Sequence, residues 1–249
     1  MSQTVPLILQ DDCEQGGKNF DESIEDDFSY RNNVLQASKN IRLAFIRKVY
    51  GILSVQLLLT VIIAAVCMFT PQITGFVQKN DWMLMLSLFG SMGILIALFI
   101  KRKDTPANFI LLTAFTVMQA YTVGVIVSFY PKIVVLQALL LTFIVLGALT
   151  VYTFQSKRDF SCLHSCLFAG LCILILGGFL QIFFHSSLME FIIGIGGAAL
   201  FCLFIIYDTQ LLMQVLSPEE YILATINLYM DIINLFLYIL RILQELNRQ

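Results

Sequence analysis

The sequence predicts an all-α membrane protein, a bundle of seven transmembrane helices with a cytosolic N-terminus. Two observations are compositional: 58% of the 249 residues are hydrophobic and only 13% are charged, and the mean hydropathy is +0.83. Soluble proteins carry about 25% charged residues, so this chain has too little polar surface to coat a globule in water. The third observation is a set of seven long apolar runs, each near the ~20 residues that cross a bilayer as a helix.

An acidic segment precedes the apolar part of the chain. Residues 1–40 contain eight acidic and three basic residues, a net charge of −5, whereas the remainder has twelve basic and nine acidic residues, a net charge of +3. We expect residues 1–45 to be a disordered cytosolic tail and residues 46–249 to be the seven-helix transmembrane domain. The tail lacks an apolar run behind a basic start, so we expect no signal peptide. The overall charge of −2, without a basic stripe, argues against nucleic-acid binding.

The apolar runs follow one another with only short polar segments between them, which leaves no room for a second domain. Their length and continuity exclude membrane-spanning strands, which would appear as alternating segments of about 10 residues. The predicted spans, in order, are residues 49–69, 82–100, 107–129, 133–154, 163–184, 190–212 and 221–240.

Basic residues in the short loops predict the orientation, because such loops stay in the cytosol. Eight bases lie before span one, after span two and after span four, whereas the opposite loops contain only Lys79 and Lys132. The last loop, residues 216–221, has two acids and no base. It permits either a seventh span with an external C-terminus or a segment that enters the membrane and returns. We favour seven spans because residues 221–240 are long enough to cross.

Two acidic residues inside the last two spans are the main functional candidates, because an ionised side chain at mid-bilayer costs at least about 2.5–3.5 kcal/mol. At 1.5 Å per residue, Asp208 in FIIYDTQ lies about 7 Å from the cytosolic loop and Asp231 in NLYMDIINLF about 15 Å. The two carboxyl groups could therefore meet. Two close carboxylates cannot both ionise cheaply, so a pair would share a proton and act as a gate. Alternatively, each aspartate separately caps a helix end or satisfies nearby backbone.

Further polar residues extend this candidate site. Asn227, Asp231 and Asn234 share one helical face at i, i+4 and i+7, so they form a polar stripe that could line an ion path. Glu190 opens span six on the external side, where it either attracts cations to a pore mouth or complements the helix dipole. Arg102, at the cytosolic end of span two, either acts as a latch on the aspartates or only marks orientation. We expect no fixed structural metal site.

Several sequence segments resemble a known family. SIEDDFSY, RLAFIRKVYGILSVQLLLT and TVYTFQSKRDFS precede FIIYDTQ, with its span-six aspartate, and LYMDIINLF, with its span-seven aspartate. This combination resembles the transmembrane Bax inhibitor motif family, in its lifeguard branch, over nearly the whole chain beyond residue 22. The resemblance implies a protein that leaks Ca²⁺ from Golgi and endoplasmic-reticulum stores and inhibits apoptosis. It also implies Bcl-2-type proteins or calcium-release channels as partners.

The resemblance carries residue roles with it. It implies that Asp208 and Asp231 form a pH-sensitive gate, that Arg102 engages this gate, and that Glu190 is associated with the pore. Gln119 departs from the pattern, because a glutamate is expected near the middle of span three. A neutral amide still coordinates through its carbonyl oxygen but supplies no charge, which implies altered conductance or ion preference.

Three function classes compete. A pH-sensitive Ca²⁺ leak channel in Golgi and endoplasmic-reticulum membranes fits the oxygen-rich stripe, because hard cations take oxygen ligands. Its partners would be membrane lipid and Ca²⁺, which permeates and is not a cofactor. A non-transporting membrane adaptor would act through protein contacts, with structural aspartates. An intramembrane aspartyl protease would activate water with the pair, but Asp231 follows Leu-Tyr-Met rather than Gly-x-Gly. We favour the leak channel and expect no enzyme activity and no cofactor.

Overall fold

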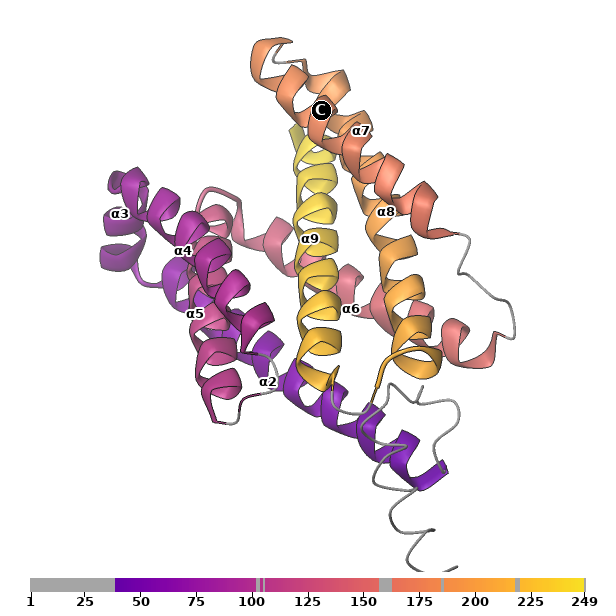
Figure 1. Cartoon of the computed structure of the whole chain (residues 1–249). Coiled ribbons are helices and arrows are strands. Elements are labelled where there is room, and N and C mark those ends of the chain that lie inside the picture. Colours follow the sequence, from indigo (N-terminus) through magenta and orange to yellow (C-terminus); the bar gives the residue numbers. More distant parts are fainter. Residues whose placement is uncertain are drawn as a thin grey trace, which may run out of the picture.

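The computed structural model of this chain describes residues 39–101, 104, 106–156, 163–184, 186–217 and 220–248. These residues form helices and no strands, so the predicted all-helical class is confirmed (Figure 1). In chain order the helices are α2 (Lys39–Phe69), α3 (Pro71–Lys79), α4 (Asp81–Ile100), α5 (Ala107–Val127), α6 (Lys132–Gln155), α7 (Leu163–Phe184), α8 (Ser187–Gln214) and α9 (Tyr221–Arg248).

Seven of these helices are long and apolar enough to cross a membrane, as the sequence predicted. The exception among the described helices is α3, a nine-residue amphipathic helix that the apolar runs did not reveal. It begins at Pro71, directly after α2, because proline suits the first helical position, where its missing N–H has no intrahelical partner. Buried Val77 faces the protein. At about 13 Å, α3 is too short to span hydrocarbon.

Two of the spanning helices extend beyond the predicted boundaries by eight residues or more. Helix α2 begins at Lys39, within the stretch of residues 1–45 that we expected to be a disordered tail; residues 1–38 of that stretch lie outside the described residues. Helix α9 continues to Arg248 instead of ending at residue 240. The predicted bounds followed apolar residues alone. Polar helix ends can lie among lipid headgroups, where about 40–45 Å of bilayer thickness is available to a helix. The 28 residues of α9 extend over about 42 Å, which matches that thickness.

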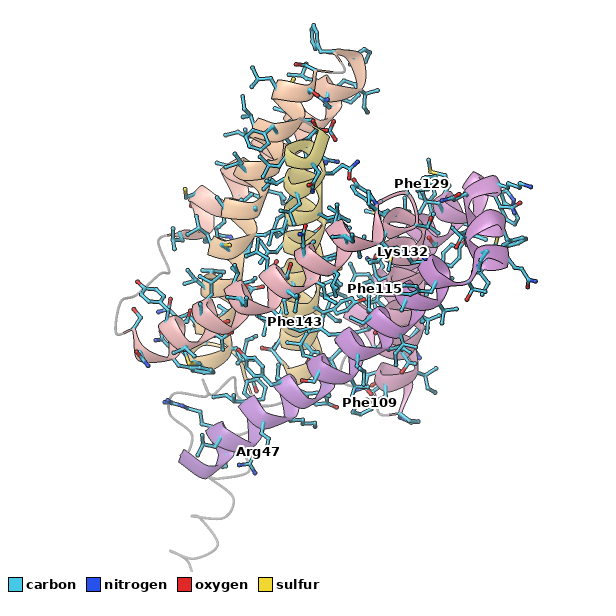
Figure 2. The ribbon with its side chains drawn as sticks, turned by 180° about the vertical axis from the view of Figure 1, so that it is seen from behind. Arg47, Phe109, Phe115, Phe129, Lys132 and Phe143 are labelled. Carbon is cyan, nitrogen blue, oxygen red and sulfur yellow. The ribbon has the colours of Figure 1, made fainter. Side chains whose placement is uncertain are left out.

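Helix α9 lies at the centre of the bundle. It packs against α8, α6 and α2, and its side chains Leu228, Tyr229, Leu235 and Leu240 are almost completely buried. Helix α5 packs on α2, and α4 packs on α5, whereas α7 packs mainly on α8 (Figure 1). The outer helices expose large apolar side chains, as a surface that faces lipid does. Viewed from behind, α2 and α6 cross in front of α9 (Figure 2).

The α8–α9 interface is tightly packed at small residues. A Cβ atom at Gly197 would lie 2.4 Å from the Tyr238 ring, and one at Gly194 would lie 3.0 Å from Ile242. The Tyr238 ring also stacks on Phe201, with 5.6 Å between the ring centroids. Glycines allow membrane helices to approach closely, because association there depends on packing rather than on a hydrophobic driving force. This packing fixes the relative height of α8 and α9.

Candidate functional site

The structure brings Asp208 of α8 and Asp231 of α9 together, with a hydrogen bond between their side chains. The two helices are consecutive and antiparallel, so the last turns of α8 lie at the same level as the first turns of α9 (Figure 1). Asp208 lies about 9 Å from the end of α8 and Asp231 about 15 Å from the start of α9. Both are buried, with 9% and 7% of their surface exposed.

A hydrogen bond between two carboxyl groups requires a proton on one of them, because a carboxylate can only accept. The arrangement is therefore suited to sharing one proton between α8 and α9. Loss of that proton would leave two negative charges side by side in a poorly solvated site, and they would repel. Asp231 Oδ2 is also buried without a hydrogen-bond partner in the described part of the chain. A buried acceptor of this kind is a place for a water molecule or a cation.

Uncharged polar residues from other helices surround the level of the pair. Thr209, next to Asp208, is fully buried, and the Tyr50 hydroxyl of α2 lies beside Thr209 and beside Thr150 of α6. These residues bring α2 and α6 into the polar interior. The sequence did not reveal these residues as candidates, because only charged residues within the spans were taken as functional candidates and a threonine is common in an apolar helix.

A second polar group lies between α2, α5 and α9. Gln56 Nε2 donates to Thr116 Oγ1 at 2.7 Å, and the hydroxyls of Thr60 and Tyr229 are 2.9 Å apart. The ring of Tyr229 also meets Phe115 edge-on, at 6.2 Å between centroids. Gln56 and Thr60 are spaced i, i+4 on α2, so their shared face was visible in the sequence as a polar pair within span one. Such interhelical hydrogen bonds tie α2 to both neighbours.

Glu190 does not join the aspartate pair. It lies in the first turn of α8, about 27 Å along the helix from Asp208, and its Oε1 is 3.7 Å from Arg241 Nε of α9. Nearby, Ser187 donates to Glu245 at 3.1 Å. The acid predicted for a pore mouth thus has a basic partner. Outside the spans, burial raises the pKa of Tyr130; the charge of Arg241 opposes this shift, and Glu190 and Glu245 add to it.

The remaining predicted residues are placed as follows. Asn227 and Asn234 lie on α9 and are half-buried, and no hydrogen bond seen among the described residues joins them to either aspartate. Gln119 Nε2 of α5 lies 3.4 Å from the sulfur of Met230, the residue before Asp231. Arg102, the proposed latch, lies outside the described residues. The use of the amide stripe as an ion path stays a prediction.

The site offers few ligands to a bound metal. In the part of the chain that the structure describes, no three His, Cys, Asp or Glu side chains gather around one point. A hard cation prefers six or more oxygen ligands. The pair therefore supplies two carboxyl groups, and a cation there would keep much of its water.

Seven apolar spans around a buried acidic pair define a multi-pass helical membrane protein with ionisable groups in its interior. Residues 42–248 match the family described as inhibitor of apoptosis-promoting Bax1. The chain is 49% identical over 227 residues to protein lifeguard 4 of Mus musculus, covering 91% of this chain and 95% of that protein. The same identity and length relate it to the Golgi anti-apoptotic protein of vaccinia virus (strain Lister), with 91% and 96% covered.

A more distant relative extends the similarity to fungi. Bax inhibitor 1 of Schizosaccharomyces pombe is 37% identical over 219 residues, which cover 88% of this chain and 82% of that protein. The chain belongs to the Bax inhibitor family of anti-apoptotic membrane proteins, in its lifeguard branch. The family predicted from the motifs around Asp208 and Asp231 is thereby confirmed.

Proposed function

We propose that the protein is a proton-gated Ca²⁺-permeable leak channel of Golgi membranes, and of the endoplasmic reticulum, which lowers stored calcium and so opposes apoptosis. The observation that carries this proposal is the hydrogen-bonded pair of buried carboxyl groups on two consecutive spanning helices. Buried ionisable groups within a membrane mark ion or proton pathways. The Golgi placement rests on the name of the viral relative.

The pair acts as a gate through electrostatics. With one proton, Asp208 and Asp231 attract and hold α8 against α9. Without it, two like charges repel, so deprotonation favours a state in which the helices are further apart. A ligand or proton shifts a conformational equilibrium only by its different affinity for the two states. Rising pH therefore favours the separated, conducting state, and falling pH favours the closed state.

The contacts on one side of the pair support the proposal, because they would block an ion between α8 and α9. Towards the Arg241 end, α8 and α9 meet at Gly197 and Tyr238, and Phe201 stacks on the same tyrosine ring. Apart from the Tyr238 hydroxyl, these contacting side chains offer no polar group to replace the hydration shell of an ion. Ca²⁺ that reaches the aspartates would stop there until α8 and α9 separate. The gate and the apolar seal lie on the same pair of helices, so one movement would open both.

Calcium flux in liposomes that contain only the purified protein tests this proposal. The variant Asp231→Asn keeps a hydrogen-bonding side chain but cannot become charged. We expect it to remain closed and to lose the rise in flux between about pH 6 and about pH 8, by tenfold or more at the upper end, which corresponds to about 1.4 kcal/mol.

The matched control is Asp104→Asn, which makes the same chemical change at an exposed position outside the spans. It should leave the pH profile unaltered. Unchanged flux in Asp231→Asn across this pH range would contradict the gate. If the wild-type protein gives the same flux as protein-free liposomes at every pH, the channel proposal is contradicted, and the hypothesis of a non-transporting membrane adaptor is favoured.

A further inference from the structure

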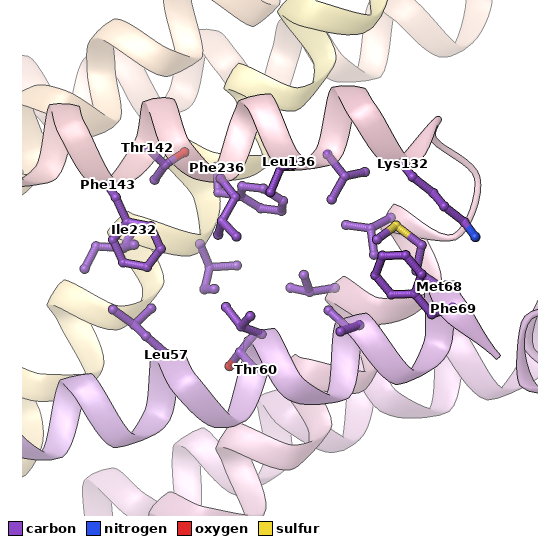
Figure 3. Close-up of a pocket in the computed structure, with 18 of the residues that line it drawn as sticks. Leu57, Thr60, Met68, Phe69, Lys132, Leu136, Thr142, Phe143, Ile232 and Phe236 are labelled. Carbon is purple, nitrogen blue, oxygen red and sulfur yellow. The ribbon is translucent and has the colours of Figure 1, made fainter.

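An apolar cavity opens between α2 and α6, away from the aspartate pair (Figure 3). Its volume is about 390 Å³, and its base is formed by residues of α5 and α9. Apart from Thr60, Thr142 and Lys132, every lining side chain is apolar. We call this cavity the α2–α6 window.

The window faces the surrounding lipid. Its rim residues Phe69, Ile133, Leu136 and Phe143 are 59%, 72%, 57% and 48% exposed, so they belong both to the cavity wall and to the outer surface. The two helices run alongside each other without packing closely, and the cavity lies between them (Figure 3). At this depth the neighbouring medium is hydrocarbon.

The length of the window matches one acyl chain. Its lining runs along α2 from Leu57 to Phe69 and along α6 from Lys132 to Phe143, which are about 18 Å and about 16 Å at the rise of a helix. One leaflet contributes about half of the ~30 Å hydrocarbon core. The walls offer water few partners, because the hydroxyls of Thr60 and Thr142 already form hydrogen bonds within the protein.

A positive charge stands at one end of the window. Lys132 is the first residue of α6, and its Nζ lies 4.8 Å from the centre of the Phe69 ring, so the ammonium group bridges the end of α2 and the start of α6. Lys132 is exposed, and in the described part of the chain no carboxylate forms an ion pair with it. The start of a spanning helix is the level at which phosphates of lipid headgroups lie.

We propose that the α2–α6 window binds an anionic glycerophospholipid from the leaflet at the Lys132 end. One acyl chain fills the cavity, and the phosphate binds Lys132. The chain lies against Ile232 and Ile233, which directly follow Asp231 on α9, so the lipid supports the central helix beside the acidic pair. This binding stands independently of the proposed channel function.

Photo-crosslinking tests the site. The purified protein is placed in phosphatidylcholine vesicles that contain phosphatidylglycerol with a diazirine in its acyl chain, irradiated, digested and analysed by mass spectrometry. We expect adducts on the lining residues of α2 and α6. Ala65→Phe places a ring in the cavity and should reduce these adducts at least fivefold. Ala169→Phe makes the same change on the exposed face of α7 and should leave them unchanged.

The headgroup contact has its own variants. Lys132→Gln should reduce phosphatidylglycerol adducts in the window at least threefold, Lys132→Arg should retain them, and Lys79→Gln, at an exposed lysine outside the window, should have no effect. The same reagent built on phosphatidylcholine should label the window more weakly than phosphatidylglycerol does and should not respond to Lys132→Gln.

Three results would overturn the proposal. They are adducts spread evenly over the lipid-facing helices, adducts in the window that persist in Ala65→Phe, and crosslinks between two protein copies through the window. If Ala65→Phe does not yield a monodisperse protein, Leu136→Trp on the rim takes its place with the same expected loss. Equal labelling by both lipids, unaffected by Lys132→Gln, would overturn the anionic assignment.

Discussion

The α8–α9 interface and the α2–α6 window border the same central helix but are built in opposite ways. At the first, backbones approach closely at Gly197, and two carboxyl groups are buried against each other. At the second, helices stay apart and leave an apolar cavity. The difference follows from the solvent: hydrocarbon can fill an apolar gap at little cost, whereas a polar group within the membrane needs a partner from the protein. The α8–α9 interface therefore contains both a close helix contact and the buried carboxyl groups, whereas the window contains neither.

The largest effect should come from disturbing the tight interface. Gly197→Ala places a Cβ atom 2.4 Å from the Tyr238 ring, so α8 and α9 must separate or the ring must move. We expect a loss of about 3 kcal/mol in the free energy of unfolding, at the upper end for overpacking. Thermal unfolding in detergent measures this loss.

The neighbouring glycine provides the control. A Cβ atom at Gly196 would meet nothing within 4 Å. Gly196→Ala should therefore be neutral or stabilising, because alanine is the better helix former by up to about 1 kcal/mol. Equal destabilisation by both variants would show that the helix contact at Gly197 is not what limits stability.

The next effect concerns the proton between the aspartates. If the folded pair holds a proton that two separated carboxyl groups release, the stability of the protein should fall as pH rises above about 4, where separated carboxyl groups are ionised, and should level off once the folded pair has also lost its proton. One proton corresponds to a slope of at most about 1.4 kcal/mol per pH unit. Unfolding measured across pH should show this slope in the wild type and not in Asp208→Asn. A slope retained in the variant would assign the proton to another group.

A smaller effect is expected between the two regions, where Thr60 lines the window and its hydroxyl meets that of buried Tyr229. Thr60→Val preserves the shape but leaves the tyrosine hydroxyl without this partner, which should cost about 1 kcal/mol. Thr113→Val is the matched control, because the Thr113 hydroxyl is exposed and bonds only to the Phe109 carbonyl of its own helix. Similar melting temperatures for the two variants would contradict a stabilising contact between α2 and α9.

The smallest effect should come from the half-exposed ion pair at the other end of α8. Glu190→Gln removes the charge that faces Arg241 and should change the free energy of unfolding by about 0.5 kcal/mol or less, as for other exposed pairs. If Glu190 also attracts cations to a pore mouth, the same variant should reduce Ca²⁺ flux at low calcium. Flux equal to that of the wild type at every calcium concentration would leave the residue a structural role alone.

Hydropathy was sufficient to predict the seven spans, because each must provide an apolar run of bilayer length. Hydropathy could not predict α3, because this nine-residue helix is amphipathic and too short to form an apolar run. It also could not predict the first turns of α2, from Lys39, because they are polar. The position of an aspartate within a span was visible as an isolated charge. In the consecutive helices α8 and α9, a short connection made a meeting of Asp208 and Asp231 predictable.

Contacts between distant spans were not predictable from the sequence. The pairing of Glu190 with Arg241 and of Gln56 with Thr116 depends on which helices are neighbours and how they are rotated. A single sequence contains the apolar periodicity of each helix but little information on its partners, especially where nearly every face is apolar. The α2–α6 window was not predictable for the same reason, because a cavity depends on how helices are arranged and no residue type indicates it.

Helix α7 contacts the bundle mainly through α8, and almost all of its surface is left to lipid. Any displacement of α8 must therefore carry α7 with it, so the moving body would be a two-helix hairpin rather than one rod. Such a hairpin sweeps a larger cross-section of the bilayer as it shifts. In the proposed gating, lateral tension and membrane thickness would then do work on the separation of α8 from α9, and the mechanical state of the host membrane would be a further input.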